Sequence, residues 1–147
     1  MEFSLVRRNG ILGNYWCGYV SFPKRPVIEQ GYEGILTYVP VHGGITFATE
    51  YKNGMTYGFD CGHYKDANNL DLQNIAYLAD ECIRMALAIK MAAKYEKRYL
   101  KCKDDNGKKV KIIEKYHLRL LKENLSDGDL DITDNFGAMM NTIFNSF

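Results

Sequence analysis

The chain has 147 residues, 46% of them apolar and 25% charged, which is close to the average folded domain and excludes a disordered or fibrous protein. With 19 Lys and Arg against 18 Asp and Glu, the net charge of +1 gives no overall attraction to long nucleic acid or to an anionic membrane. No run reaches the ~18 apolar residues of a membrane span, and the N-terminal residues lack the apolar stretch of a signal peptide. We therefore expect a cytoplasmic protein with no membrane partner.

Strand-like segments fill the first part of the chain. Apolar and aromatic residues dominate five segments: 3–8, 12–22, 35–41, 45–52 and 55–61. The dipeptides Asn9-Gly10 and Asn53-Gly54 are typical of two-residue hairpin turns, whereas residues 23–34 contain Pro and Gly and are expected to form a loop. These segments predict an antiparallel sheet of about five strands.

Residues 70–99 are expected to form one long helix, because apolar residues recur there every three or four positions. Asn68 or Asn69 is the expected cap at its start. Lysine and arginine gather between residues 90 and 101, towards the end of this helix. A phosphate grip is one explanation of this basic run, and a solvated helix end is the more common one.

The rest of the chain allows two arrangements. Residues 110–125 have helical spacing, while the Asn-Gly pair at 106–107 also fits a hairpin of residues 100–103 with 109–113. Residues 126–134 are expected to be a linker, and an apolar stripe through Phe136, Met140 and Phe147 predicts an amphipathic tail that forms a homo-oligomer contact. The predicted fold is thus an α+β domain over residues 1–125, with the linker and tail over residues 126–147.

The four cysteines are far apart in sequence and form no CxxC pair, so we expect free thiols in a reducing compartment. A zinc site built from His42, His63 and either Cys61 or Asp66 is a weaker alternative, because the spacing is not a familiar one. We predict no metal and no cofactor.

The densest group of unusual residues lies around the predicted hairpin 45–61. A turn at Asn53-Gly54 would place Lys52 opposite Met55 and, by extension, Thr46 opposite Cys61. In that register His42, Thr46, Cys61 and His63 share one face, and Asp60 points to the other.

This group is the candidate binding site, and it comprises His42, Gly43, Gly44, Thr46, Asp60, His63 and Asp66. Glycine amides can cradle an anion, and histidines can contact it or act in acid–base chemistry. The alternative is purely structural, since glycines in strands also mark bulges and tight bends. Trp16, the only tryptophan, fits core packing better than stacking on a base.

Four segments in chain order resemble a family of small phage and prophage proteins. They are residues 16–20 (WCGYV), residues 41–47 (VHGGITF), residues 58–63 (GFDCGH), and Tyr77 followed by Glu81-Cys82. The resemblance implies a phage origin and a small α+β fold, but no activity. The chain departs from the family pattern in a short segment between Phe47 and Gly58, and in an addition after about residue 100.

Three functional hypotheses follow, two of them by analogy with other small phage proteins. The first is an anti-defence protein that sequesters a small anionic ligand, such as a cyclic nucleotide immune signal, in the host cytoplasm. The second is a hydrolase or phosphodiesterase that uses His42 and His63, and the third is an inhibitor that binds a host defence protein. We favour sequestration, because the sequence offers histidines but no clear nucleophile or metal cage.

Overall fold

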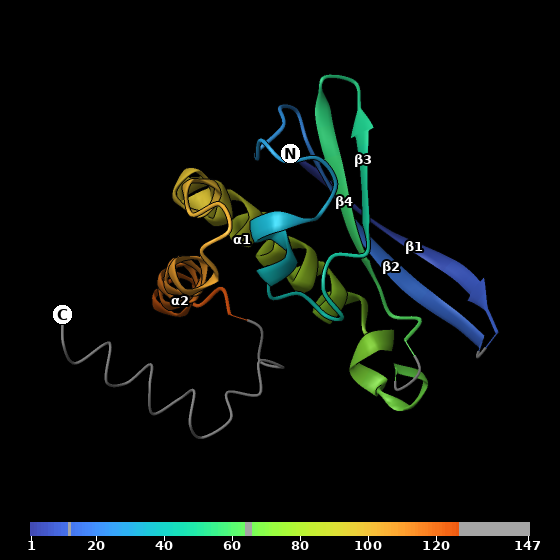
Figure 1. Cartoon of the computed structure of the whole chain (residues 1–147). Coiled ribbons are helices and arrows are strands. Elements are labelled where there is room, and N and C mark those ends of the chain that lie inside the picture. The colour runs from blue at the N-terminus through green and yellow to red at the C-terminus, as the bar shows by residue number, and fades with distance from the viewer. Residues whose placement is uncertain (12, 64–65, 127–147) are drawn as a thin grey trace.

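The computed structural model describes residues 1–11, 13–63 and 66–126 (Figure 1). In chain order its elements are β1 (Glu2–Gly10), β2 (Gly13–Phe22), η1 (Gly34–Tyr38), β3 (Phe47–Tyr51), β4 (Gly54–Asp60), η2 (Asp66–Asn68), η3 (Leu70–Gln73), α1 (Ile75–Lys101) and α2 (Asn106–Lys122). The predicted α+β class is confirmed. The predicted amphipathic tail lies outside the described residues, and the homo-oligomer contact assigned to it stays a prediction.

One antiparallel sheet has the strand order β1-β2-β4-β3, so it has four strands and the expectation of five is wrong. The segment predicted as the additional strand, residues 35–41, instead forms η1 and a turn. Its backbone groups bond locally, as in the bond from the Val39 amide to the Leu36 carbonyl, and Pro40 has no amide hydrogen to give to a ladder. The apolar side chains that suggested a strand are buried all the same, among them Ile35 and Leu36.

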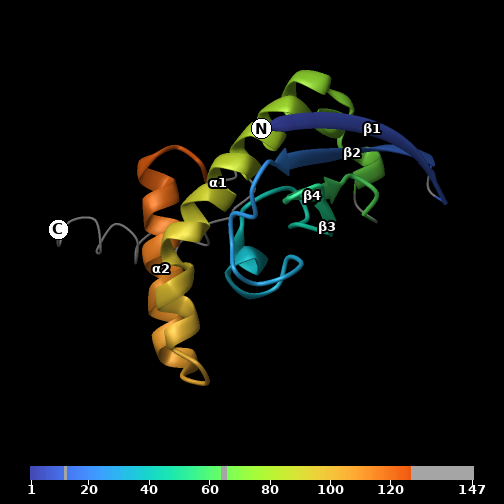
Figure 2. The ribbon, with the colours of Figure 1, turned by 90° about the horizontal axis from the view of Figure 1, so that it is seen from above.

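The two faces of the sheet have different partners. One face packs against α1 and carries Val20, Tyr57 and Phe59, each at most 1% exposed (Figures 1 and 2). We call it the covered face. Trp16 belongs to it and packs against the core, with the Arg7 guanidinium 5.2 Å from the centre of its ring, which confirms the expected core role. On the opposite face, which we call the open face, no helix packs within the described part of the chain.

Helix α1 begins five residues later than predicted, because two asparagines cap two successive helices. The Asn69 side chain accepts a hydrogen bond from the Asp71 amide at the start of η3. The Asn74 side chain accepts from the amides of Ala76 and Tyr77 at the start of α1. Among the described residues, no helix combines the length and the apolar character that a membrane crossing requires.

The second helix, not the hairpin, is the arrangement that the structure adopts. The Asp105 side chain accepts from the Lys108 amide and caps the start of α2, which begins four residues before the predicted helix. α2 packs beside α1 (Figure 2), where the Tyr116 hydroxyl donates to the Ala88 carbonyl at 2.9 Å. We call α1 and α2 together the helical hairpin. Within it, α1 contacts both the sheet and α2.

The loop before η1 is held to α1 by a buried carboxylate. The oxygens of Glu96, which is 3% exposed, accept hydrogen bonds from the amides of Ile28 and Glu29 at 2.6 and 3.2 Å. A buried carboxylate needs such donors, so Glu96 fixes the loop and has a structural role.

Candidate functional site

A groove of about 670 Å³ opens at one end of the sheet, where the β1–β2 hairpin faces the chain that follows β4. This volume lies within the range of small-molecule sites. From the open face it is lined by Arg8, Tyr15, Cys17, Tyr19, Phe47 and Asp60, and from the adjoining loops by Thr46, His63 and Asp66. The groove thus combines aromatic rings, one guanidinium and several polar groups.

The aromatic wall of the groove follows from the strand register. Arg8 pairs with Tyr15, and Ser4 pairs with Tyr19, so these side chains stand on the open face. The Arg8 guanidinium donates to the Tyr19 hydroxyl at 3.0 Å, and the Tyr19 ring meets the edge of Phe47 at a centroid distance of 5.4 Å. A cation and two rings are therefore held together on one wall.

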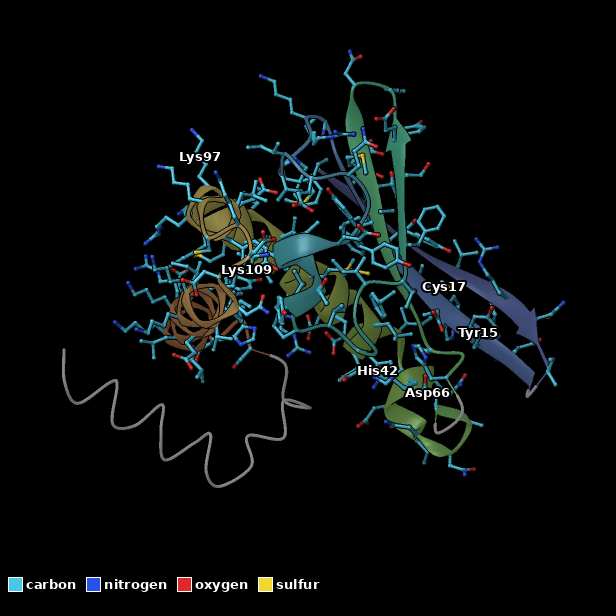
Figure 3. All side chains as sticks on the ribbon, in the orientation of Figure 1. Tyr15, Cys17, His42, Asp66, Lys97 and Lys109 are labelled. Carbon is cyan, nitrogen blue, oxygen red and sulfur yellow. The ribbon has the colours of Figure 1, made fainter. Side chains whose placement is uncertain are left out.

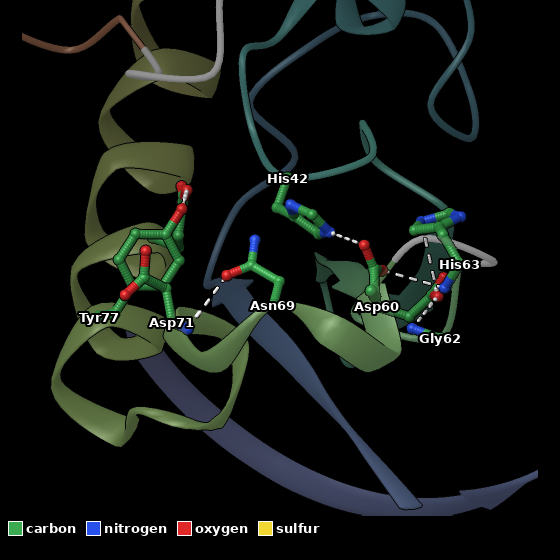
Figure 4. A network of polar contacts seen from close by, with 9 residues as sticks. His42, Asp60, Gly62, His63, Asn69, Asp71 and Tyr77 are labelled. Atoms are coloured by element: carbon green, nitrogen blue, oxygen red, sulfur yellow. Dashed lines mark hydrogen bonds and ion pairs between the residues drawn. The ribbon is translucent and has the colours of Figure 1, made fainter. Parts of the chain in front are cut away.

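Asp60 organises the mouth of the groove. One of its carboxylate oxygens accepts the Thr46 hydroxyl at 2.8 Å, and the other accepts the Gly62 amide at 3.0 Å. His63 Nε2 lies 3.6 Å from the same oxygen that Gly62 uses. Through Thr46 the carboxylate ties the end of β4 to the segment that leads into β3, and Figure 4 shows its contacts with Gly62 and His63.

Asp66 has a similar role deeper in the site, where it is 6% exposed. One oxygen lies 2.9 Å from His42 Nε2, and the other accepts the His63 amide at 3.0 Å. The two carboxylates therefore direct all four of their oxygens at protein groups. They shape the site more than they offer binding groups to a ligand.

The Gly43-Gly44 turn brings the two histidines together. Gly43 and Gly44 have φ angles of 69° and 77°, a backbone region that favours glycine. A side chain at Gly43 would also lie 2.2 Å from His63 Nε2, so His63 packs directly on this turn. The rings of His42 and His63 have centroids 6.0 Å apart, which confirms the predicted proximity of the pair.

The register that predicted this proximity is wrong by two residues. Phe47 pairs with Gly58 instead of Asp60, and the turn falls at Lys52-Asn53, where Lys52 has a φ of 54°. Gly54 is the first residue of β4, and only glycine fits there because a side chain would lie 1.7 Å from the Phe22 carbonyl oxygen. The Asn53-Gly54 pair therefore reflects tight packing as well as a turn.

The predicted faces need one further correction. Thr46 was expected opposite Cys61 and away from Asp60, yet its hydroxyl bonds to Asp60. Thr46 precedes β3, so the strict alternation of a strand does not apply to it. A shift of two residues alone would have kept every side chain on its predicted face.

The seven predicted residues divide into two groups. Thr46, Asp60, His63 and Asp66 line the groove. His42, Gly43 and Gly44 are not among its described lining residues: His42 lies behind Asp66, and the Gly44 amide donates to the Val41 carbonyl within the turn. That bond uses the amide that an anion cradle at this turn would need.

Sequence reasoning missed most of the open face. The first hairpin reverses between Gly10 and Gly13, two residues beyond the Asn9-Gly10 signal. Tyr15, Cys17 and Tyr19 alternate along β2, so their shared face was visible in the sequence. Only the true register shows that Arg8 joins them.

The cysteines at the site are poor nucleophiles. All four cysteines are free, as predicted. Burial raises the pKa of the Cys61 thiol to about 12, and burial also raises the pKa of Cys17. Since the thiolate is the reactive form, neither side chain supplies an activated nucleophile near neutral pH.

The last of the resembling segments serves the core. Cys82 is fully buried in α1, and its sulfur would lie 2.8 Å from a side chain added at Gly18 on the covered face. Tyr77 donates to the buried Glu81, which also pairs with Arg84 at 2.9 Å. These residues seat α1 on the sheet behind the groove.

Metal chemistry has no evident site in the part of the chain that the structure describes, where no group of three or more His, Cys, Asp or Glu side chains is placed to hold a metal ion. The comparisons with known proteins add no family: no protein-family model, no curated protein and no solved structure matches this chain. The geometry of the groove is therefore the basis for a functional conclusion.

Proposed function

We propose that this protein binds and sequesters a small anionic ligand in the groove, with cyclic nucleotides as the candidate class. The observation that carries the proposal is the convergence of a guanidinium, aromatic rings and neutral polar groups around a cavity of about 670 Å³, whose carboxylates, Asp60 and Asp66, are held by protein groups. Pockets of this kind, mostly apolar with a few placed polar groups, are typical of small-molecule sites.

The parts of a nucleotide match different parts of the groove. A phosphate would accept charge-assisted hydrogen bonds from Arg8, the only Lys or Arg among the described lining residues. A base would stack against Tyr15 or Phe47, since aromatic rings bind any base through its face. Thr46 and His63 would contact the sugar or the polar edge of the base.

The biological role that we propose is interference with host defence. The resemblance to small phage proteins motivates this step, since a protein that holds a cyclic nucleotide signal deprives the host receptor of it. The described part of the groove has no activated nucleophile, which favours holding the ligand over cleaving it.

Isothermal titration against a panel of cyclic nucleotides tests the proposal. Arg8→Ala should weaken binding about tenfold or more, because a charged hydrogen bond is worth ~1.5–3 kcal/mol. Arg25→Ala is the control, since Arg25 pairs with Glu50 and is not among the described lining residues of the groove. Failure of every cyclic nucleotide to bind contradicts the proposal, as does an equal loss in both variants.

One observation supports a hydrolase as the second candidate. His63 lines the groove with its Nε2 3.6 Å from an Asp60 oxygen, as a general base is often oriented by a carboxylate, whereas His42 lies behind Asp66. Heat denaturation of a loaded complex separates the two functions: intact ligand in the supernatant indicates sequestration, and cleaved ligand indicates catalysis. His63→Asn should abolish cleavage in the second case.

A further inference from the structure

The charge of this protein is strongly segregated. Residues 90–123, which include the second half of α1 and all of α2, contain twelve Lys or Arg and five Asp or Glu. The excess of seven positive charges there is balanced by an excess of six negative charges over the rest of the chain. The net charge of +1 does not reveal this distribution. The packing of α1 beside α2 brings the two basic segments together.

On α1 the cations form a single line. Lys90, Lys94, Lys97 and Lys101 follow each other at steps of four, three and four residues, so they share one side of the helix over about 16 Å. All four are exposed. In Figure 3 Lys97 points away from the sheet, on the outer side of the helical hairpin.

A second line runs along α2, through Lys108, Lys111, Lys115 and Arg119 at steps of three, four and four. These residues are exposed as well. Nitrogen-tipped side chains accordingly spread from both helices in Figure 3.

The acidic residues of the hairpin neutralise little of this charge. Glu96 is buried and bonded to the loop before η1, while Asp105 pairs with Lys108 and Glu123 pairs with Arg119. The four lysines of the α1 line and two of the α2 line have no ion-pair partner among the described residues. Their field is therefore available to a partner.

We propose that the helical hairpin binds the phosphodiester backbone of nucleic acid without sequence preference. Repeated, solvated lysines recognise phosphates as point charges, and contacts to phosphates carry no sequence information. An anionic membrane fits less well, because Val110 is the only large apolar side chain exposed between residues 90 and 123. Attraction to a polyanion acts over roughly 8–10 Å at physiological salt, so the local charge excess decides it and the charge of the whole chain does not.

This surface is independent of the groove, and its test uses a different probe. Fluorescence anisotropy with a labelled 20-base-pair DNA duplex should show binding that weakens with salt, by roughly 150-fold between 50 and 200 mM for about four phosphate contacts. Lys94→Glu with Lys97→Glu should weaken binding at least tenfold. The double variant Lys111→Glu with Lys115→Glu tests the α2 line, and it should also bind the duplex less tightly.

A control with the same change of charge separates a local surface from a global effect. Lys24→Glu with Lys52→Glu reverses two exposed lysines that lie outside the hairpin, and it should change the affinity less than threefold. Circular dichroism melts verify that all variants fold. The proposal is overturned if the duplex does not bind, if the control loses as much affinity as the α1 variant, or if the wild-type protein binds vesicles of anionic lipid in preference to the duplex.

Discussion

The two faces of the sheet are built from the same strands but are governed by different physical demands. On the covered face, Val20, Tyr57 and Phe59 are excluded from water by α1. On the open face, Arg8 and Tyr19 hold each other by a hydrogen bond and stay partly hydrated. The difference shows how alternation along a strand assigns stability to one side and a candidate binding site to the other.

The largest effect that we expect is alkaline destabilisation from the covered side. Burial raises the pKa values of Tyr57, Cys61 and Cys82 to about 12, above their ordinary values of 10, 9 and 9. The unfolded chain ionises these groups first, so the stability that their neutral forms provide is complete below about pH 9 and is lost as the pH rises towards 12.

Urea unfolding between pH 8 and pH 11 measures this loss. Each of the three groups should remove roughly 1.4 kcal/mol of the free energy of unfolding per pH unit once it ionises in the unfolded chain. A free energy of unfolding that stays constant from pH 9 to pH 11 would show that these groups are not buried as described.

A matched pair of glycine substitutions then compares the faces directly. Gly18→Ala places a methyl group 2.4 Å from the Phe59 ring and 2.8 Å from the Cys82 sulfur, both of them buried. Overpacking of this kind should lower the free energy of unfolding by about 1–3 kcal/mol. Chemical denaturation followed by tryptophan fluorescence reports it through Trp16, and an unchanged midpoint would contradict the tight seat of α1.

Gly58→Ala introduces the same methyl group on the open face, 2.6 Å from the Tyr19 ring. Tyr19 is only half-buried and can move towards solvent, so the free energy of unfolding should fall by less than about 1 kcal/mol, part of it offset by the strand preference of Ala over Gly. The ligand that titration identifies should nevertheless bind more weakly, since Tyr19 lines the groove. Equal stability losses at Gly18 and Gly58 would remove the distinction between the faces.

The smallest change in the free energy of unfolding is expected from a substitution at Tyr57, where the direction of the change is informative. The Tyr57 hydroxyl is buried and has no hydrogen-bond partner among the described residues. Tyr57→Phe therefore removes only the desolvation cost of a polar group, and the free energy of unfolding at pH 7 should stay the same or rise by up to ~1 kcal/mol. Thermal melts test this; a clear loss of stability would reveal a partner for the hydroxyl.

Local signals predicted the helices better than the strands. The long helix was predicted from its apolar spacing, yet its start was misplaced, because Asn69 caps η3 and only Asn74 caps α1. The Asn9-Gly10 and Asn53-Gly54 pairs marked correct hairpins but the wrong turn residues, and the Asn-Gly pair at 106–107 lies in α2 instead of a hairpin. A turn signal acts on local conformation, while the register also depends on which side chains of the paired strands must be buried.

By itself the sequence determined the α+β class, the free thiols and the proximity of His42 and His63, but it placed Thr46 on the opposite face from Asp60. Only the tertiary structure decided that Arg8 and the alternate aromatic residues of β2 complete the groove, because strand register is a long-range property. It also decided that two basic segments, each ordinary alone, stand side by side on α1 and α2. Packing decides which charged side chains share one surface, and neither composition nor periodicity predicts which segments pack together.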